Sequence, residues 1–219
     1  MSGERALDEA PSQPPGLREK KRVQVEHELA ACALRLFATR GYDAVTVDEI
    51  ADAAGVSRRT FFRYYTSKED LLFGFPNRDR PLYFISASRF RELLGEAFSQ
   101  PDGGDLSAFA AALSAVAAEI EPFREQIGQV IAACERSAVL RGRRAGAAQQ
   151  LVDWMGDAMA GRHGRTSDED SDTLARVAMT IFDAAVGRWV ETEPATPLRE
   201  HIERLFAQLR RLSAPPQPK

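Results

Sequence analysis

The feature that most constrains this chain is a segment in which two short amphipathic helices are separated by a single glycine. Thr46 and Glu49 have the spacing of a capping box, in which the hydroxyl caps a helix amide and the carboxylate reaches back. Gly55 supplies the positive φ that a sharp helix end requires, and Ser57 is suited to cap the following helix. We therefore predict a helix, a tight turn, a second helix and the start of a third over residues 46–72.

The second of these helices carries unopposed positive charge. Residues 56–68 contain three arginines and one lysine but no acidic residue, and four aromatic rings are interleaved with them. At about 100° per residue, Phe61 and Tyr65 fall on one side of the helix, and Arg59 and Arg63 fall near the opposite side. One face can therefore pack while the other enters a groove.

The basic face suits the major groove of DNA, which is about 12 Å wide and admits a helix. Arginine reads O6 and N7 of guanine, so Arg59 and Arg63 are the expected base readers, and Thr60 is expected to contact a thymine methyl or a phosphate. Donors at helix ends fix register on phosphates rather than read sequence, which is the role expected of Thr46, Tyr64 and Lys68. The predicted DNA-binding residues are Thr46, Ser57, Arg58, Arg59, Thr60, Arg63, Tyr64 and Lys68.

The alternative is an ordinary solvated helix packed by its rings, which is what most charge runs are. The joint pattern favours DNA, because the capping box, the glycine turn, the basic face and a further cap at Ser67 occur together.

The stretch LRLFATRGYDAVTVDEIADAAGVSRRTFFRYYTSKEDLL resembles the DNA-binding domain of the TetR (tetracycline repressor) family of bacterial transcriptional regulators. The match runs from about residue 23 to residue 72. It includes the LF…G pair, the T-x-x-x-I-A run, AGVS and SKEDLL. The family often has Tyr where Phe62 stands and His-Phe where Tyr64 and Tyr65 stand, so the phosphate-reaching hydroxyl is expected here from Tyr64.

Composition limits the class of protein. A chain of 219 residues with 44% hydrophobic residues can bury a core without disulfides or metals. It has no run of about 18 apolar residues to span a membrane, and its charged N-terminus is not a signal peptide.

Cys32 and Cys134 are expected to be small buried hydrophobes, and we place the protein in the cytoplasm. A net charge of −3 is compatible with DNA binding, because the electrostatic field at the contact face matters more than the summed charge of the chain.

The pattern of breaks predicts an all-α fold with an N-terminal three-helix DNA-binding domain and a larger C-terminal helical bundle. We expect disordered tails at 1–17 and 213–219, a helix-turn-helix domain at 18–72, and a ligand-binding and dimerisation domain at 73–212. The basic residues at 18–22 either lie in the minor groove or are simply solvated. Further helices are predicted at 82–99, 106–120, 123–135, 139–161, 169–191 and 197–212, the fifth opening with acidic residues that suit a helix N-terminus.

The family resemblance implies that the larger domain dimerises through its last two helices and encloses a pocket whose ligand releases DNA. The apolar stripes of those helices give the predicted dimer interface, which is Phe182, Ala185, Val186, Trp189, Ile202, Leu205, Phe206 and Leu209. The available pocket liners are Phe84, Phe90, Phe109, Phe123, Trp154, Met155 and Met159. Both sets are also typical of an ordinary core.

The leading hypothesis is a homodimeric, ligand-responsive transcription regulator, most simply a repressor, that binds a palindromic operator in double-stranded DNA. Its partners would be DNA, a second copy and an unidentified small-molecule effector, with no cofactor, metal or membrane. Two alternatives remain: a larger domain that docks another protein, and an all-helical enzyme. His27, His163 and His201 have no metal-ligand spacing and are expected at the surface or at helix ends, so catalysis has little support.

Overall fold

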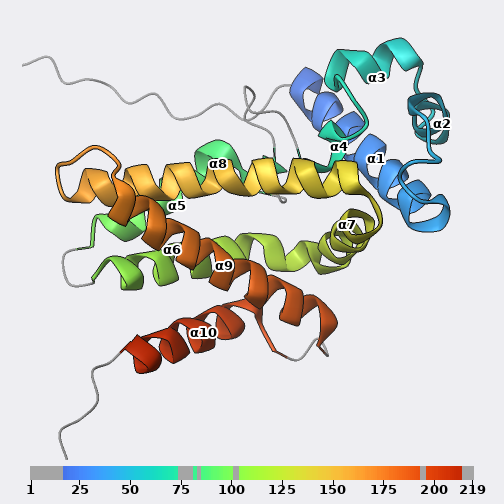
Figure 1. The fold of residues 1–219 in the computed structure, drawn as a ribbon. Helices are drawn as coiled ribbons and strands as arrows, with labels where there is room; N and C mark the ends of the chain where they lie inside the picture. Colours follow the sequence, from blue (N-terminus) through green and yellow to red (C-terminus); the bar gives the residue numbers. More distant parts are fainter. Residues whose placement is uncertain (1–16, 74–80, 83–84, 101–103, 193–195, 214–219) are drawn as a thin grey trace, which may run out of the picture.

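The computed structural model describes residues 17–73, 81–82, 85–100, 104–192 and 196–213, and nearly all of them are helical. The helices form a small unit, α1 to α4, at one end of a larger bundle, α5 to α10 (Figure 1). This confirms the predicted all-α class. Both predicted disordered tails lie almost entirely outside the described residues, as does Phe84.

The N-terminal unit consists of α1 (Leu17–Arg40), α2 (Val47–Ala53), α3 (Arg58–Tyr64) and α4 (Asp70–Phe73). α1 ends where Gly41 takes a positive φ of 81°. Leu29, Ala33 and Phe37 of α1 are buried against side chains of α2 and α3, including Ile50 and Phe61. The helix packing predicted from the apolar stripe of the first helix is thus present.

The basic residues before this unit are already helical. Lys21 and Arg22 lie in the first turns of α1, and Arg22 pairs with Glu26 at 3.3 Å. This part of the chain is therefore not an extended arm ready to enter a minor groove.

The larger bundle follows the predicted order with small shifts at the ends. Its elements are α5 (Ala87–Phe98), α6 (Asp105–Ile120), the short 3-10 helix η1 (Glu121–Phe123), α7 (Arg124–Arg136), α8 (Ala138–Arg162), α9 (Glu169–Glu191) and α10 (Leu198–Ser213). α9 begins as predicted, with Asp168 accepting from the Ser171 hydroxyl at 2.7 Å and from the Ser171 amide at 2.9 Å, and these hydrogen bonds lower the pKa of Asp168. The helix predicted over 82–99 begins later, because Pro81–Leu82 (β1) pairs antiparallel with Ile85–Ser86 (β2) and Ser86 then caps α5.

Two apolar clusters organise the core, and they meet where α7 passes under α1. One gathers the N-terminal helices, and it also takes in Val130, Ala133 and Cys134 of α7 and Leu140 of α8. The other fills the space between α5, α6, α8, α9 and α10. The N-terminal unit therefore rests on the bundle through packed side chains rather than through a bare linker.

The apolar stripes of α9 and α10 face their own chain, and most residues of the predicted dimer interface lie in its core. Each of the following six residues is at most 7% exposed within the single chain: Phe182, Ala185, Val186, Trp189, Ile202 and Phe206. Leu205 and Leu209 are only partly buried. All six lie in the main apolar cluster, because α10 packs against α6 and α9.

The structure bears on two expectations from composition, one about membrane-spanning stretches and one about the cysteines. The stretch Asp105–Arg136 is long and apolar enough by composition to cross a membrane, but η1 interrupts it and α6 supplies eight buried residues to the bundle core. Cys32 and Cys134 are both free and buried, as predicted.

Candidate nucleic-acid interface

The caps predicted for the two short helices are present. The Thr46 hydroxyl accepts the Glu49 amide at 3.3 Å, and the Glu49 carboxylate accepts the Thr46 amide at 2.8 Å. This backbone hydrogen bond, with further help from Arg40, lowers the pKa of Glu49 to about 2. Gly55 has a φ of 66°, and Ser57 accepts the Thr60 amide at 3.1 Å. The caps and the glycine thus set where α3 starts and in which direction it leaves the turn.

α3 has a packed face and an open face, and it lies on the outer side of the N-terminal unit (Figure 1). Phe61 and Tyr64 on α3, with Tyr65 just after it, are buried, whereas the basic side chains are exposed. Arg59 has no hydrogen bond or ion pair within the described parts of the chain. Its guanidinium is therefore available to an incoming acceptor.

Arg58 and Arg63, the other arginines of α3, have intramolecular partners. Arg58 donates to both carboxylate oxygens of Asp48 at 2.8 and 2.7 Å, although both side chains remain more than half exposed. Arg63 lies over the ring of Tyr64 and donates to its hydroxyl at 2.8 Å. The exposed Arg58–Asp48 pair contributes at most about 1 kcal/mol, so a phosphate can replace Asp48.

Tyr64 is more enclosed than its predicted role requires. Its side chain is only 9% exposed, and its hydroxyl already accepts from Arg63. The sequence placed Tyr64 at the flank of the helix, but the tertiary packing turns its ring inward. Accepting from Arg63 leaves the O–H of Tyr64 free to donate, so the burial of the ring is what limits a contact with phosphate.

Lys68 has a structural role that the sequence did not suggest. Its ammonium donates to the carbonyl oxygens of Tyr42 at 2.7 Å and Val45 at 2.9 Å, and it lies 3.9 Å from the centroid of the Tyr42 ring. Lys68 thereby ties the turn after α3 to the turn between α1 and α2. At most one of its three N–H groups is left for a phosphate.

The turn before α4 is held by Asp70, the first residue of that helix, rather than by the hydroxyl of Ser67. One oxygen of this buried carboxylate accepts the amides of Thr66 at 3.1 Å and Ser67 at 2.9 Å. The other oxygen accepts from Arg143 of α8 at 3.1 Å. Asp70 therefore joins the turn that follows α3 to the larger bundle.

The predicted pocket liners that the structure describes are packing residues. Phe90, Phe109, Met155 and Met159 are at most 6% exposed in the main cluster, and Phe123 and Trp154 pack against it. Neither of the two hollows found in the described structure is lined by any of them. Aromatic and Met residues at helical spacing have here formed a core.

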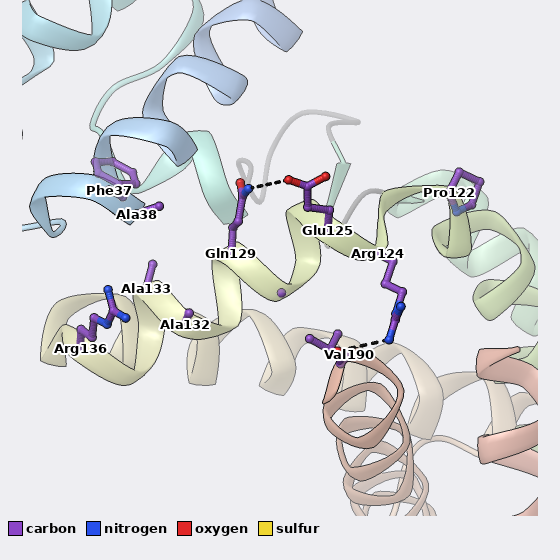
Figure 2. Close-up of a pocket in the computed structure, with 11 residues that line it drawn as sticks. Phe37, Ala38, Pro122, Arg124, Glu125, Gln129, Ala132, Ala133, Arg136 and Val190 are labelled. Atoms are coloured by element: carbon purple, nitrogen blue, oxygen red, sulfur yellow. Dashed lines mark hydrogen bonds between the residues drawn. The ribbon is translucent and has the colours of Figure 1, made fainter. Parts of the chain in front are cut away.

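The larger hollow is an open groove of about 690 Å³ along α7 (Figure 2). Phe37 and Ala38 of α1 lie at one end, and Arg124 and Val190 lie at the other, where Arg124 donates to backbone carbonyls at the end of α9. Its remaining lining mixes small and charged side chains of α7. The groove therefore runs along the seam between the N-terminal unit and the bundle.

The smaller hollow is an apolar cavity of about 20 Å³ where α4 meets the bundle. Leu72 lines it from α4, and the Arg144–Asp183 ion pair, at 3.2 Å, lies at its wall. The rest of its lining is apolar and comes from α6, α7 and α9: Ile120, Ile127, Val130, Ile131, Met179, Phe182 and Val186. It adjoins the N-terminal unit directly.

The three histidines differ in setting. His27 is exposed, and His163, at the C-cap of α8, is 3.0 Å from Asp105. His201 was expected at the surface but is 6% exposed, and burial, followed by the nearby Arg204 and Arg188, lowers its pKa. No group of three or more potential metal ligands occurs in the part of the chain that the structure describes.

A helix-turn-helix unit with an exposed basic second helix, set on a helical bundle, defines a class of DNA-binding regulators. Residues 29–74 match the model of the bacterial regulatory proteins of the tetR family. The helix-turn-helix unit of this chain therefore matches the DNA-binding part of that family. The segment is 46% identical over 57 residues to the HTH-type transcriptional regulator TcmR of Streptomyces glaucescens, which is 26% of this chain and 25% of that protein. The match thus spans only about a quarter of the curated relative.

Solved structures extend the likeness to the whole fold. FadR of Thermus thermophilus, a TetR-family repressor in complex with lauroyl-CoA, has a TM-score of 0.55 at 21% identity over 88% of this chain and 97% of its own. FadR of Bacillus subtilis, in complex with stearoyl-CoA, has a TM-score of 0.55 at 18% identity over 84% and 96%. At these identities the likeness establishes a shared architecture for both parts of the chain.

Proposed function

We propose that this protein is a transcription regulator that binds DNA through α3 and releases it when a small molecule enters the helical bundle. The observation that carries the proposal is the outer face of α3, where Arg59 is exposed and has no hydrogen bond or ion pair with any residue that the structure describes. Phosphate contacts from Ser57, Thr46 and Arg58 would hold the helix in register, while Arg59 and Arg63 read base edges. The match of residues 29–74 to the tetR family model supports this assignment.

The functional unit is a homodimer on a palindromic site. One seven-residue helix covers too few base pairs to specify an operator, and paired helices about 34 Å apart reach successive turns of the major groove. Because the buried stripes of α9 and α10 serve the core, the partner would pack on the apolar side chains that remain partly or fully open. These are Leu174, Val177 and Ile181 of α9 and Leu205, Leu209 and Leu212 of α10.

The effector would act at the apolar cavity beside α4. About 20 Å³ is far below the roughly 300 Å³ of an ordinary ligand pocket, so a ligand must part the helices to enter. Leu72 lines this space, and parting the helices would move α4 and, with it, the turn that ends α3. Two proteins of this architecture are in complex with acyl-CoA, which makes an apolar chain a suitable probe. A ligand shifts the protein away from DNA only if it prefers the parted state.

Selection of bound fragments from random DNA by the purified protein tests the central proposal, and a recovered palindrome is the expected result. Arg59→Ala should then cost about 1 to 3 kcal/mol on the selected site and much less on scrambled DNA. Arg211→Ala, which removes an exposed arginine of α10, serves as the matched control and should leave both affinities unchanged. Equal losses on both DNAs for Arg59→Ala would contradict its role as a base reader.

A repressor that docks a protein is the second candidate, and the filled core at the expected pocket favours it. Titration of the DNA complex with lauroyl-CoA separates the two. A ligand inside the bundle should release DNA from the unaltered protein and from Ala132→Trp, in which the groove is filled. It should fail to release DNA from Val186→Phe, in which the cavity is filled.

A further inference from the structure

The recognition helix exposes one large apolar side chain. The ring of Phe62 is 44% exposed, whereas Phe61, Tyr64 and Tyr65 around it are at most 9% exposed. Among the residues that the structure describes, only Val139 and Leu212 are comparable exposed large hydrophobics, and both lie outside the N-terminal unit.

Phe62 is exposed but held in place. Its ring meets that of Phe61 edge to face, with centroids 5.3 Å apart and an interplanar angle of 79°. The guanidinium of Arg58 lies 5.3 Å from the centroid of the same ring, and Asp48 anchors that guanidinium. The ring therefore has a fixed direction before any partner arrives, which reduces the entropy cost of a contact.

Phe62 also shares the open side of α3 with the proposed base readers. At about 100° per residue it is about 60° around the helix from Arg59 and about 100° from Arg63. The buried rings of Phe61 and Tyr64 lie on the other side. A helix placed so that Arg59 and Arg63 reach base edges brings Phe62 to the floor or wall of the same groove.

The major groove offers one apolar group to such a ring, the C5-methyl of thymine. We propose that Phe62 is a specificity-determining residue that reads a thymine methyl in the operator half-site. The inference rests on the proposed DNA-binding function and deepens it, since it adds a base preference that needs no hydrogen bond. Burial of one methyl-sized group against the ring should favour thymine over uracil about fourfold in each half-site.

Deoxyuridine gives a direct test, because it differs from thymidine only by that methyl. Each thymine of the selected operator is replaced in turn by deoxyuridine, symmetrically in both half-sites, and binding is titrated at fixed salt. For the unaltered protein we expect about fourfold weakening per half-site at one or two positions and none elsewhere. Phe62→Ala should bind the thymine and uracil forms of those positions equally, while Phe62→Tyr, which keeps the ring, should still discriminate.

Leu212→Ala is the matched control, since it removes an exposed apolar side chain from α10 and should leave the discrimination intact. Thermal unfolding of each variant verifies folding, which is expected because Phe62 is not a core residue. The proposal is overturned if the unaltered protein binds every uracil duplex as tightly as the thymine duplex, as a contact to deoxyribose would predict. It is also overturned if Phe62→Ala keeps the preference, or if the half-site contains no thymine. In each of these cases the protein still binds DNA, whereas failure to bind any duplex would refute the proposed function itself.

Discussion

At the scale of single residues, local chemistry fixed the caps, and tertiary contacts redirected the long side chains. Thr46 and Glu49 pair as their spacing predicts, because both partners lie within one helical turn. Lys68 and Tyr64 were expected to face DNA. In the folded chain the ammonium of Lys68 instead binds backbone carbonyls, and the ring of Tyr64 is buried. The sequence around Lys68 does not show the carbonyls of Tyr42 and Val45, which come from a distant turn.

We expect Lys68→Met to lower the free energy of unfolding by about 1 to 3 kcal/mol, because two carbonyl oxygens lose a charged donor. Urea unfolding followed by circular dichroism measures the change, with Lys21→Met at an exposed position of α1 as control. If Lys68 served only to contact phosphate, its replacement would leave the stability unchanged and weaken DNA binding alone.

At the scale of helices, polar links between elements decide how the N-terminal unit is held. Asp70 accepts amides of the turn before α4 and pairs with Arg143 of α8, so the end of α3 is tied to the bundle. Since Asp70 is buried, its second oxygen would lack an equivalent partner without Arg143.

A double-mutant cycle on Asp70→Asn and Arg143→Ala should give a coupling energy of about 1 kcal/mol in unfolding experiments. This value is discounted because Arg143 is half exposed. The same cycle on Arg89 and Glu92, an exposed pair at 2.7 Å within α5, should give less than about 0.5 kcal/mol. Equal coupling energies would mean that the Asp70–Arg143 pair between helices stabilises the fold no more than an exposed pair within one helix does.

His201 of α10 should make stability sensitive to mild acid. Its pKa is lowered by burial and by Arg204 and Arg188, while Glu200 acts in the opposite direction. The folded protein therefore favours neutral imidazole, so this stability is present above the unfolded-state pKa of about 6.5 and is lost as the pH falls through the lower folded value. We expect His201→Leu to flatten the loss of stability between pH 7 and 5 in urea unfolding at a series of pH values, and an unchanged slope would contradict this role.

At the scale of the whole molecule, periodicity identified the apolar stripes but not the surface they would cover. The stripe of α10 could equally have met a second chain, and only the position of α6 and α9 shows that it packs within its own. The same holds for the predicted pocket liners, because those that the structure describes pack in or against the core, whereas the groove and the small cavity lie at the seam with the N-terminal unit.

We therefore expect Trp189→Ala to lower the unfolding free energy by about 3 to 5 kcal/mol, as large-to-small core changes do. Ile181→Glu, on the partly open side of α9, should instead leave a folded monomer with much weaker operator binding. Sedimentation with parallel thermal unfolding distinguishes the two effects. A dimer that persists in Ile181→Glu would place the interface elsewhere.

The sequence by itself determined the helices, their caps and the basic face of α3. These depend on residues three or four positions apart, and their geometry is the same wherever a helix occurs. Only the tertiary structure decided that Tyr64 turns inward, that Phe62 remains exposed, that Asp70 reaches Arg143, and that the stripes of α9 and α10 close on their own bundle. Those outcomes depend on which distant surfaces meet, and hydrophobic burial is not directional, so an apolar pattern states what is buried but not against what.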